Sequence, residues 1–229
     1  MTSVASSPQL PLLFPSDHEA RLDTFVWEAA QEALRIHCFG ASSAAGFHWL
    51  WGRPGAGKSH LLQGIARARE DALYLPASRL RAYEPSCLQS LQQGRLLLID
   101  DVDLLAQPAW EEPLFCLLQA LLDGGGECWF SAAGPPAKAP FKLPDLQSRL
   151  QLALVFEVRE LGDEGKAAAL VARAARRGIE LRDEVLQFIL ARNTRSMHDL
   201  ALLLDRLDHS ALAEQRRVTV PFVKSVMGW

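Results

Sequence analysis

Apolar residues follow two patterns along the chain, one typical of strands and one of helices. Between residues 47 and 158, five short apolar runs alternate with more polar segments, and each run is apolar on both faces. Such runs predict strands of a parallel sheet that helices cover on both sides. The expected strands are Phe47–Gly52, Ala72–Pro76, Arg95–Asp101, Glu127–Ala132 and Ala153–Val158.

Helical spacing of apolar residues separates these runs and continues after them. It predicts helices over Phe25–Phe39, Lys58–Glu70 and Ala109–Leu122. From Asp163 onward only helices and turns are expected, with possible caps at Asp163, Ser196 and Thr219. The predicted fold class is therefore α/β, with a parallel sheet between helices, followed by a small all-α bundle. We expect a flexible tail at 1–18, an α/β domain at 19–161 and a helical domain at 162–229.

Composition and charge narrow the class of protein. Hydrophobic residues make up 49% and charged residues 22% of the 229 residues, and the formal net charge is −3. This charge argues against a protein that coats nucleic acid or an anionic membrane by bulk charge. The four cysteines stand far apart without a C-x-x-C pair, which disfavours a zinc site or a disulfide framework. A signal-peptide pattern and a membrane-length apolar run are both lacking, so we expect a cytoplasmic protein.

The most informative motif is GRPGAGKS, residues 52–59, which lies between a predicted strand and a predicted helix. Its glycines let backbone amides turn toward phosphate oxygens, and the helix N-terminus adds a positive end. Lys58 is expected to reach the β and γ phosphates, and the Ser59 hydroxyl to bind Mg²⁺. The alternative is that the motif matches by chance, which the flanking strand and helix disfavour. His60 directly follows the motif, and its alternative role is local packing. The candidate nucleotide-binding residues are Gly52, Pro54, Gly55, Ala56, Gly57, Lys58, Ser59 and His60.

Two carboxylates end the third predicted strand, in LLLIDD. Asp100 stands at the carboxyl end of this strand, where it is expected to hold Mg²⁺ through water. Asp101 follows at the position for an acid that orients the attacking water. A pair of solvated carboxylates is the alternative, and it is disfavoured beside a phosphate-binding loop. The sequence therefore predicts a site for a nucleotide with Mg²⁺.

These segments resemble the AAA+ ATPases, and among them the bacterial replication initiator DnaA. GRPGAGKSHLLQ, LLLIDDVDLLA and the helical bundle carry the resemblance, which covers about Leu22–Trp229. It implies that the segment Asp23–Val26 packs around the adenine, so Phe25 and Val26 join the nucleotide-binding candidates. LPDLQSRL is similar to the family's box VII, in which Arg149 would be an arginine finger pointing at the nucleotide of a neighbouring subunit. From the residues alone, Arg149 could instead cap its own helix or pair with Asp145.

Two features separate the chain from DnaA itself. The family's C-terminal DNA-binding domain is expected to be missing after Trp229, so strong sequence-specific DNA binding is not expected. QLPLLF is similar to peptides that dock on the β sliding clamp of DNA polymerase III, and prolines around it reduce the entropy lost on docking. A tail that packs onto its own domain is the alternative. In the clamp interpretation Gln9 makes hydrogen bonds, and the apolar pockets are filled by Leu10, Leu12, Leu13 and Phe14.

Two nucleotide-sensing positions depart from the family pattern. The polar residue after the fourth strand is replaced by Ala133, and the lid arginine by His198, with Arg195 as a less favoured substitute. The resemblance then implies stable binding of a nucleoside diphosphate, ADP before others, and weak or absent intrinsic ATP hydrolysis. It implies a clamp-tethered inhibitor of replication initiation that presents Arg149 to the ATP bound by DnaA.

Other interpretations stay open. A self-sufficient AAA+ ATPase, such as a helicase loader or transposition helper, would keep its own hydrolysis. A pure adaptor would bind the clamp and DnaA without arginine chemistry. Arg173, Arg176 and Arg177 are expected to form a solvated basic face, with a contact to DNA or DnaA as the alternative. The base preference of the pocket and the choice between monomer and homodimer also stay open.

Overall fold

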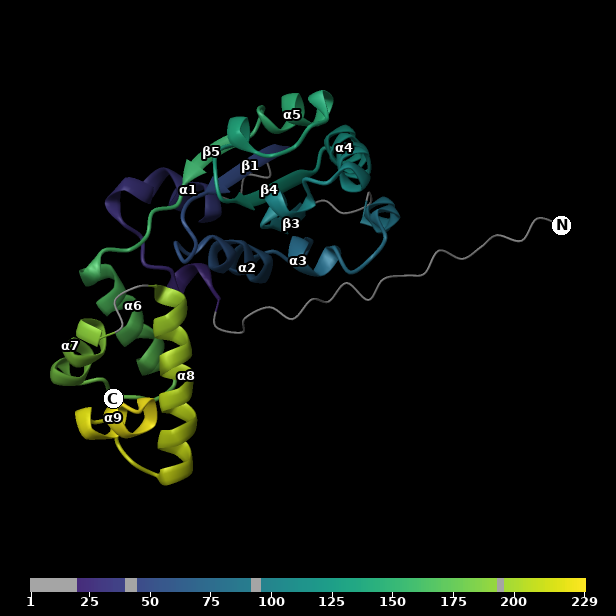
Figure 1. Cartoon of the computed structure of the whole chain (residues 1–229). Coiled ribbons are helices and arrows are strands. Elements are labelled where there is room, and N and C mark those ends of the chain that lie inside the picture. Colours follow the sequence, from purple (N-terminus) through teal and green to yellow (C-terminus); the bar gives the residue numbers. More distant parts are fainter. Residues whose placement is uncertain (1–19, 40–44, 92–95, 193–195) are drawn as a thin grey trace.

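The computed structural model of the chain describes residues 20–39, 45–91, 96–192 and 196–229. An α/β domain carries the sheet, and a smaller domain made of helices lies at one end of it (Figure 1). The predicted clamp-binding residues Gln9 to Phe14 and the lid residue Arg195 lie outside the described residues.

The α/β domain is built on a parallel sheet of five strands in the order β2-β3-β4-β1-β5. All five predicted strands are present, with ends within one residue of the expected ones. In the register of β1, Trp49 lies opposite Phe130 of β4 and Val155 of β5. The strands are β1 (Gly46–Trp51), β2 (Ala72–Pro76), β3 (Leu96–Asp100), β4 (Glu127–Ala132) and β5 (Leu154–Glu157).

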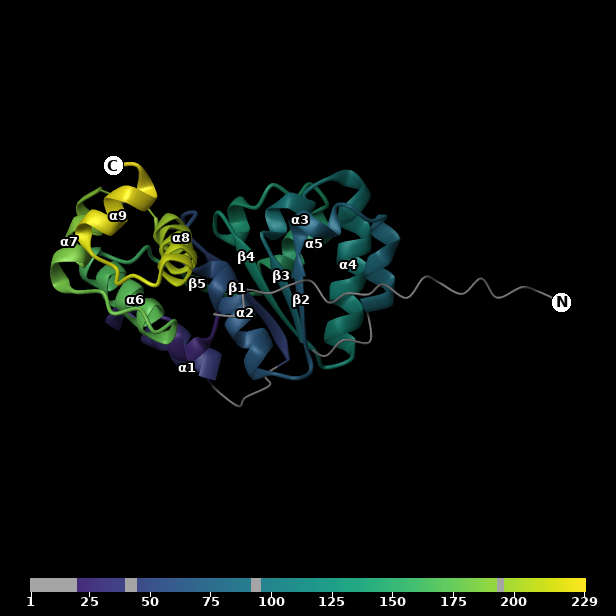
Figure 2. The same ribbon diagram turned by 90° about the horizontal axis from the view of Figure 1, so that it is seen from below.

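Helices cover both faces of this sheet, as the continuous apolar runs predict. One face packs against α3 (Ala77–Leu80), α4 (Pro108–Asp123) and α5 (Pro144–Leu150). The other packs against α1 (Glu32–Phe39) and α2 (Lys58–Ala68). The view from below shows the sheet between α2 on one side and α4 on the other (Figure 2). The α/β class of the first domain is therefore confirmed.

The segment before α1 differs from the prediction of one helix over residues 25–39. Between residues 20 and 31 only short 3-10 turns at Leu22–Thr24 and Ala29–Gln31 precede α1, and Phe25 has an extended backbone with φ −74° and ψ 129°. The Phe25 ring packs against Trp27 with a centroid distance of 4.6 Å. It also approaches Gly57 so closely that a Cβ there would lie 2.8 Å from it. Contact with the loop after β1 therefore outweighs the helical pattern of this segment.

The second domain contains the helices α6 (Asp163–Arg176), α7 (Asp183–Arg192), α8 (Met197–Glu214) and α9 (Val220–Met227). Their apolar faces form a separate core that includes Leu170, Leu203 and Phe222. Ser196 caps α8 by accepting a hydrogen bond from the Asp199 amide at 3.1 Å, whereas the N-cap of α6 is Gly162 rather than Asp163. The predicted all-α bundle is therefore confirmed. Within the described ranges, every helix is too short or too polar to span a bilayer.

Candidate functional site

A cleft with a volume of about 1110 Å³ opens between the carboxyl ends of the strands and the second domain. Its walls come from the segment around Phe25, from the loops after β1, β3 and β4, and from α6 and α8. Open α/β sheets bind ligands at this edge. Of the predicted site residues, the cleft is lined by Phe25, Val26, Pro54, Gly55, Ala56, Gly57, Lys58, Ser59, His60 and Asp101.

The loop after β1 has the glycine-dependent geometry that the motif predicts. Gly55 and Gly57 have φ values of +84° and +98°, which side chains with a Cβ rarely adopt. At Gly52, a Cβ would lie 2.1 Å from the carbonyl oxygen of Val158, so only glycine lets the loop pass β5 at this distance. The loop then leads directly into α2 at Lys58, which directs the helix N-terminus at the cleft.

Lys58 points back into this loop. Its ammonium donates hydrogen bonds to the carbonyl oxygens of Gly52 at 2.8 Å and Arg53 at 3.1 Å, and only 8% of the residue is exposed. Burial lowers the pKa of Lys58, while the negative charges of Asp101, Asp100 and Asp103 act in the opposite direction. A phosphate oxygen is a stronger acceptor than a carbonyl oxygen, so phosphate can replace these two partners.

Asp100 is buried below the cleft and is held by two hydroxyl groups. The Tyr74 hydroxyl donates to its Oδ2 at 2.6 Å, and the Ser131 hydroxyl donates to its Oδ1. Ser131 in turn accepts from the Asp101 amide at 2.7 Å, and Gln63 donates to Tyr74 at 3.0 Å. Each carboxylate oxygen has a second lone pair, so Asp100 can still accept a hydrogen bond from metal-bound water. The sequence pattern does not point to Tyr74, Ser131 or Gln63, because each lies in an ordinary strand or helix pattern.

Two further carboxylates after β3 line the cleft, Asp101 and Asp103. Asp101 has a left-handed backbone with φ 52°. Asp103 accepts a hydrogen bond from the Ala133 amide at 2.6 Å, which joins the loop after β3 to the end of β4. Burial raises the pKa of both carboxyl groups. The LLLIDD motif does not include Asp103, and the only sequence signal for it is its place two residues after Asp101.

The helical domain forms the opposite wall of the cleft. A Cβ at Gly55 would lie 3.3 Å from the Cβ of Ser196, so the start of α8 lies next to the loop after β1. His198 lines the cleft from the first turn of α8. The three arginines predicted to form a solvated basic face, Arg173, Arg176 and Arg177, line the cleft, where Arg176 is exposed and the other two are partly buried.

The third of these arginines also connects two helices of the domain. The Arg177 guanidinium lies 2.5 Å from a carboxylate oxygen of Asp205 and 4.0 Å from one of Asp208, both on α8. A tertiary contact between helices, which a linear pattern does not contain, therefore turns this side chain inward.

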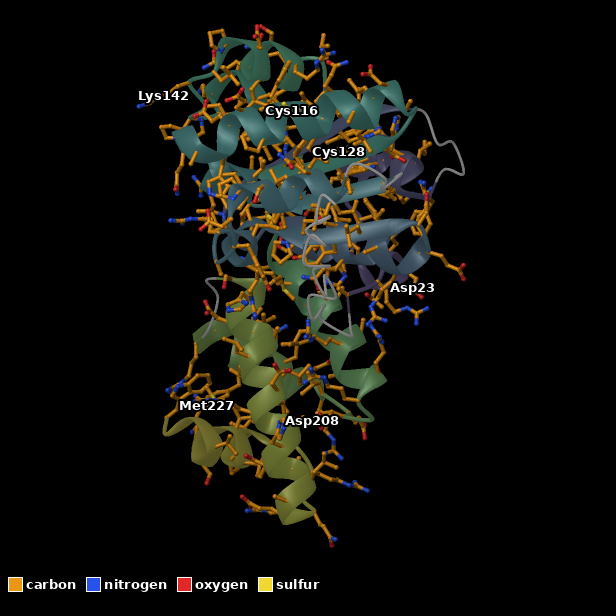
Figure 3. The ribbon with its side chains drawn as sticks, turned by 90° about the vertical axis from the view of Figure 1, so that its right-hand side faces the viewer. Asp23, Cys116, Cys128, Lys142, Asp208 and Met227 are labelled. Carbon is orange, nitrogen blue, oxygen red and sulfur yellow. The ribbon has the colours of Figure 1, made fainter. Side chains whose placement is uncertain are left out.

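Arg149 lies on the other face of the sheet, outside the residues that line the cleft. It is half-buried on α5, and its guanidinium donates to the side-chain oxygen of Gln119 on α4. Gln119 donates in turn to Asp123 at 2.8 Å. Lys142, just before α5, lies at the opposite end of the molecule from Asp208 of the helical domain (Figure 3).

The position of α5 is set at its other end as well. Glu111 of α4 accepts hydrogen bonds from the amides of Lys142 at 2.9 Å and Leu143 at 2.6 Å. Glu111 is buried, with 4% of the residue exposed. Helix α4 therefore holds α5 near both ends, and the Arg149 guanidinium is oriented by α4 rather than by its own helix.

The described side chains of this cleft do not form a metal-binding site by themselves. Within the described part of the chain, no three His, Cys, Asp or Glu side chains are arranged to hold a metal ion. The hydroxyl of Ser59 and the buried carboxylate of Asp100 instead suit a hydrated Mg²⁺ that a phosphate group helps to bind.

Comparison with known proteins agrees with this architecture. The family model "Hda, lid domain" matches residues 163–227, which make up the helical domain. Domain III of the Thermotoga maritima replication initiation protein DnaA is 20% identical, with a TM-score of 0.80 over 94% of this chain and 98% of that one. AMPPCP-bound DnaA from Aquifex aeolicus is 18% identical, with a TM-score of 0.69 over 82% of this chain and 65% of that one.

A branch-migration motor has the same fold. The Thermotoga maritima RuvB Holliday junction branch migration motor is 17% identical, with a TM-score of 0.64 over 87% of this chain and 66% of that one. The chain therefore has the fold of DnaA domain III, an α/β domain followed by a small helical domain. We call the helical domain, whose residues 163–227 match the Hda lid-domain model, the lid.

Proposed function

We propose that this chain is a negative regulator of DNA replication initiation that binds ADP with Mg²⁺ and activates ATP hydrolysis by DnaA. The observation that carries the proposal is the Hda-type lid on a DnaA-like fold. The phosphate-binding loop and the open cleft support the nucleotide part. Arg149, held on a face away from that cleft, supports the part that concerns a second protein.

The chain's own nucleotide would be bound along the floor and walls of the cleft. Lys58 and the amides at the start of α2 would bind the phosphates, and the Phe25 segment would pack against the base. Ser59, together with water held by Asp100, would bind Mg²⁺, which neutralises phosphate charge when it is bound. Mass spectrometry of nucleotide released from the purified protein tests this part. Detection of ADP supports it, and a protein that neither contains nor takes up a nucleotide contradicts it.

Arg149 would act on the ATP of DnaA rather than on the chain's own nucleotide. A guanidinium placed against the transferred phosphoryl group stabilises the negative charge of the transition state. Such a group must reach out of its own subunit with a defined orientation. The contacts of α5 with Gln119 and Glu111 of α4 would supply that orientation.

The test is the substitution Arg149→Ala, with Arg159→Ala as the matched control. Arg159 is an exposed arginine after β5 that pairs with Glu157 at 3.2 Å. The stimulation of ATP hydrolysis by DnaA should fall by about 10³-fold in the first variant, on the scale known for arginine fingers, and stay unchanged in the second. ADP binding should be the same in both. Full stimulation by Arg149→Ala, as a pure adaptor would give, contradicts the finger role.

We propose that residues 1–18 tether the α/β domain (19–161) and the lid (162–229) to the sliding clamp. A tether raises the effective concentration of the regulator near DnaA, so a weak direct contact suffices. Replacing Leu12, Leu13 and Phe14 by alanine should abolish co-purification with the clamp. Alanine at Ser6 and Ser7, in the same tail, should leave it intact. Clamp binding that survives the triple substitution would contradict the tether.

A self-sufficient AAA+ ATPase is the second candidate function. It is favoured by the presence of Lys58, Ser59 and Asp101 on one cleft. It is disfavoured by two residues that line the same cleft. Ala133 has no polar side chain, and His198 has no permanent charge. Steady-state ATP hydrolysis by the protein alone distinguishes the two: a turnover of about 1 s⁻¹ or faster supports the ATPase.

A further inference from the structure

Asp103 is a cleft carboxylate without a role in the function proposed above. It belongs to the 3-10 turn Val102–Leu105 that follows β3. Its Oδ2 accepts a hydrogen bond from the Ala133 amide at 2.6 Å, and this bond fixes the carboxylate between the ends of β3 and β4. The same part of the cleft is lined by Lys58, Asp101 and Ala133.

Around Lys58 the carboxylates are close together, since the charges of Asp101, Asp100 and Asp103 all act on its ammonium. The arginines that line the cleft belong to the opposite wall, in the helical domain. Burial raises the pKa of Asp103, whereas the Ala133 amide and the Lys58 charge favour its ionised form. Because water is largely displaced from a filled cleft, charges there interact more strongly than at the surface.

The Ala133 amide and the Lys58 ammonium compensate for the charge of Asp103 only in part, because Lys58 also faces Asp100 and Asp101. Ala133 has no polar side chain, and its backbone amide is already bound to Asp103. His198 lines the cleft from the lid and lacks the permanent charge of arginine. Arg173 and Arg176 of α6 line the cleft from the helical domain rather than from the sheet. Arg177, which follows α6, is paired with Asp205.

We propose that Asp103 is a specificity-determining residue whose carboxylate makes the cleft select nucleoside diphosphates over triphosphates. The inference rests on the nucleotide site proposed above. In P-loop proteins, Mg²⁺ bridges the β and γ phosphates. The ion lies between the loop and a carboxylate at the end of the neighbouring strand. A third phosphate would therefore extend toward the loop after β3, where Asp103 repels it. The α and β phosphates stay with the loop after β1 and α2, so a diphosphate avoids this repulsion.

The test compares the Kd of ADP with that of the triphosphate analogue AMPPCP, in the presence of Mg²⁺, on nucleotide-free full-length protein. Asp103→Asn removes the charge and keeps an oxygen that can accept from the Ala133 amide. Asp103→Glu keeps the charge. Glu112→Gln removes one negative charge from an exposed position of α4, on the other face of the sheet. The ratio of the two Kd values within one preparation cancels any inactive fraction of a variant.

We expect the unmodified chain, Asp103→Glu and Glu112→Gln to prefer ADP. In Asp103→Asn the ratio of the AMPPCP Kd to the ADP Kd should fall by about tenfold, the size of a 1.4 kcal/mol effect. An unchanged ratio in Asp103→Asn overturns the proposal, and so does an equal gain for both nucleotides. A lack of preference in the unmodified chain also overturns it. If the unmodified chain binds neither nucleotide, the nucleotide site itself is contradicted, which is a distinguishable result.

Discussion

The two ends of the β-sheet each bury a cluster of polar side chains, but of these two only the cluster at the carboxyl ends adjoins the large cleft. At the carboxyl ends, Asp100 is held by Tyr74 and Ser131, and Lys58 lies beside it on the cleft wall. Lys58 is bound to backbone carbonyl oxygens of its own loop. A ligand that supplies better acceptors can take their place.

At the amino ends, Glu127 is enclosed by hydrogen-bond donors, whereas Nδ1 of the neighbouring His48 is buried without a hydrogen-bond partner among the described residues. Glu127 accepts hydrogen bonds from the Trp129 indole at 2.6 Å and from Arg69 at 3.1 Å. His48 stacks on Trp129 with a centroid distance of 4.2 Å and an angle of 12° between the rings. This cluster contributes to packing, and its members do not line the large cleft.

The difference between the two clusters shows that burial and charge alone do not identify a site. A buried polar network rigidifies a fold when its members satisfy one another. It becomes a candidate site where exchangeable partners adjoin an opening, as for Lys58. Substitution of an exchangeable group at the carboxyl end, such as Lys58, should therefore change ligand binding, whereas protonation at the amino end should change stability alone.

Among the substitutions that change stability, Gly52→Ala should lower the free energy of unfolding most. The added Cβ would lie 2.1 Å from the Val158 carbonyl oxygen and would separate the loop from β5. We expect a loss of about 3 kcal/mol, at the upper end for overpacking, measured by urea denaturation. Gly162→Ala is the control, because no atom lies within 4 Å of its added Cβ. Equal losses in both variants would contradict the close approach at Gly52.

Lys58→Ala should weaken ADP binding by about a hundredfold, since charge-assisted hydrogen bonds to phosphate are lost. Titration of the nucleotide-free protein with ADP measures the effect. Arg67→Ala, an exposed position on the same helix, should leave the Kd nearly unchanged. A similar loss in the two variants would mean that general positive charge, rather than Lys58, binds the phosphates.

Protonation of His48 should lower stability between pH 6.5 and about 4. Burial, with a smaller effect of the His37 charge, lowers the pKa of His48 from 6.5 to about 4 in the folded chain. Glu127 lies 3.6 Å away and opposes this, but its oxygens already accept from Trp129 and Arg69. The unfolded chain thus binds more protons in this window, and stability falls as the pH falls.

The size of this pH effect should be about 2 kcal/mol, somewhat below the full linkage value because the ring is not completely shielded from water. Urea denaturation at several pH values measures it. His48→Phe, which keeps an aromatic ring beside Trp129, should remove the corresponding part of the slope. A slope that persists in this variant would assign the pH dependence to other groups.

Tyr74→Phe should have the smallest effect, a loss of about 1.5 kcal/mol in the free energy of unfolding. The substitution leaves one buried Asp100 oxygen without its 2.6 Å donor, and bonds to charged acceptors are worth roughly this amount. Tyr83→Phe, at a residue that is 40% exposed, should change stability less. Thermal denaturation of both variants measures the difference. No difference would mean that water replaces the Tyr74 hydroxyl.

Most of the fold could be predicted from the sequence, because strand positions follow from short apolar runs that are buried on both faces. The helix predicted from residue 25 was the main error, since Phe25 packs on Gly57 instead of continuing a helix. The short helix α3 was also absent from the prediction. Its four residues contain too few turns for a periodic pattern.

The sequence by itself determined the order of the strands along the chain, the separate helical domain and the glycine-rich loop before Lys58. These features depend on residues that are neighbours in the chain. Only the tertiary structure decided that Tyr74 and Ser131 hold Asp100 and that Asp103 meets Ala133, because these contacts join residues 26 to 31 positions apart. It also decided that the arginines of α6 line the cleft, since the packing of α6 against α8 sets that direction. Local pattern specifies elements, and packing between elements decides which side chains meet.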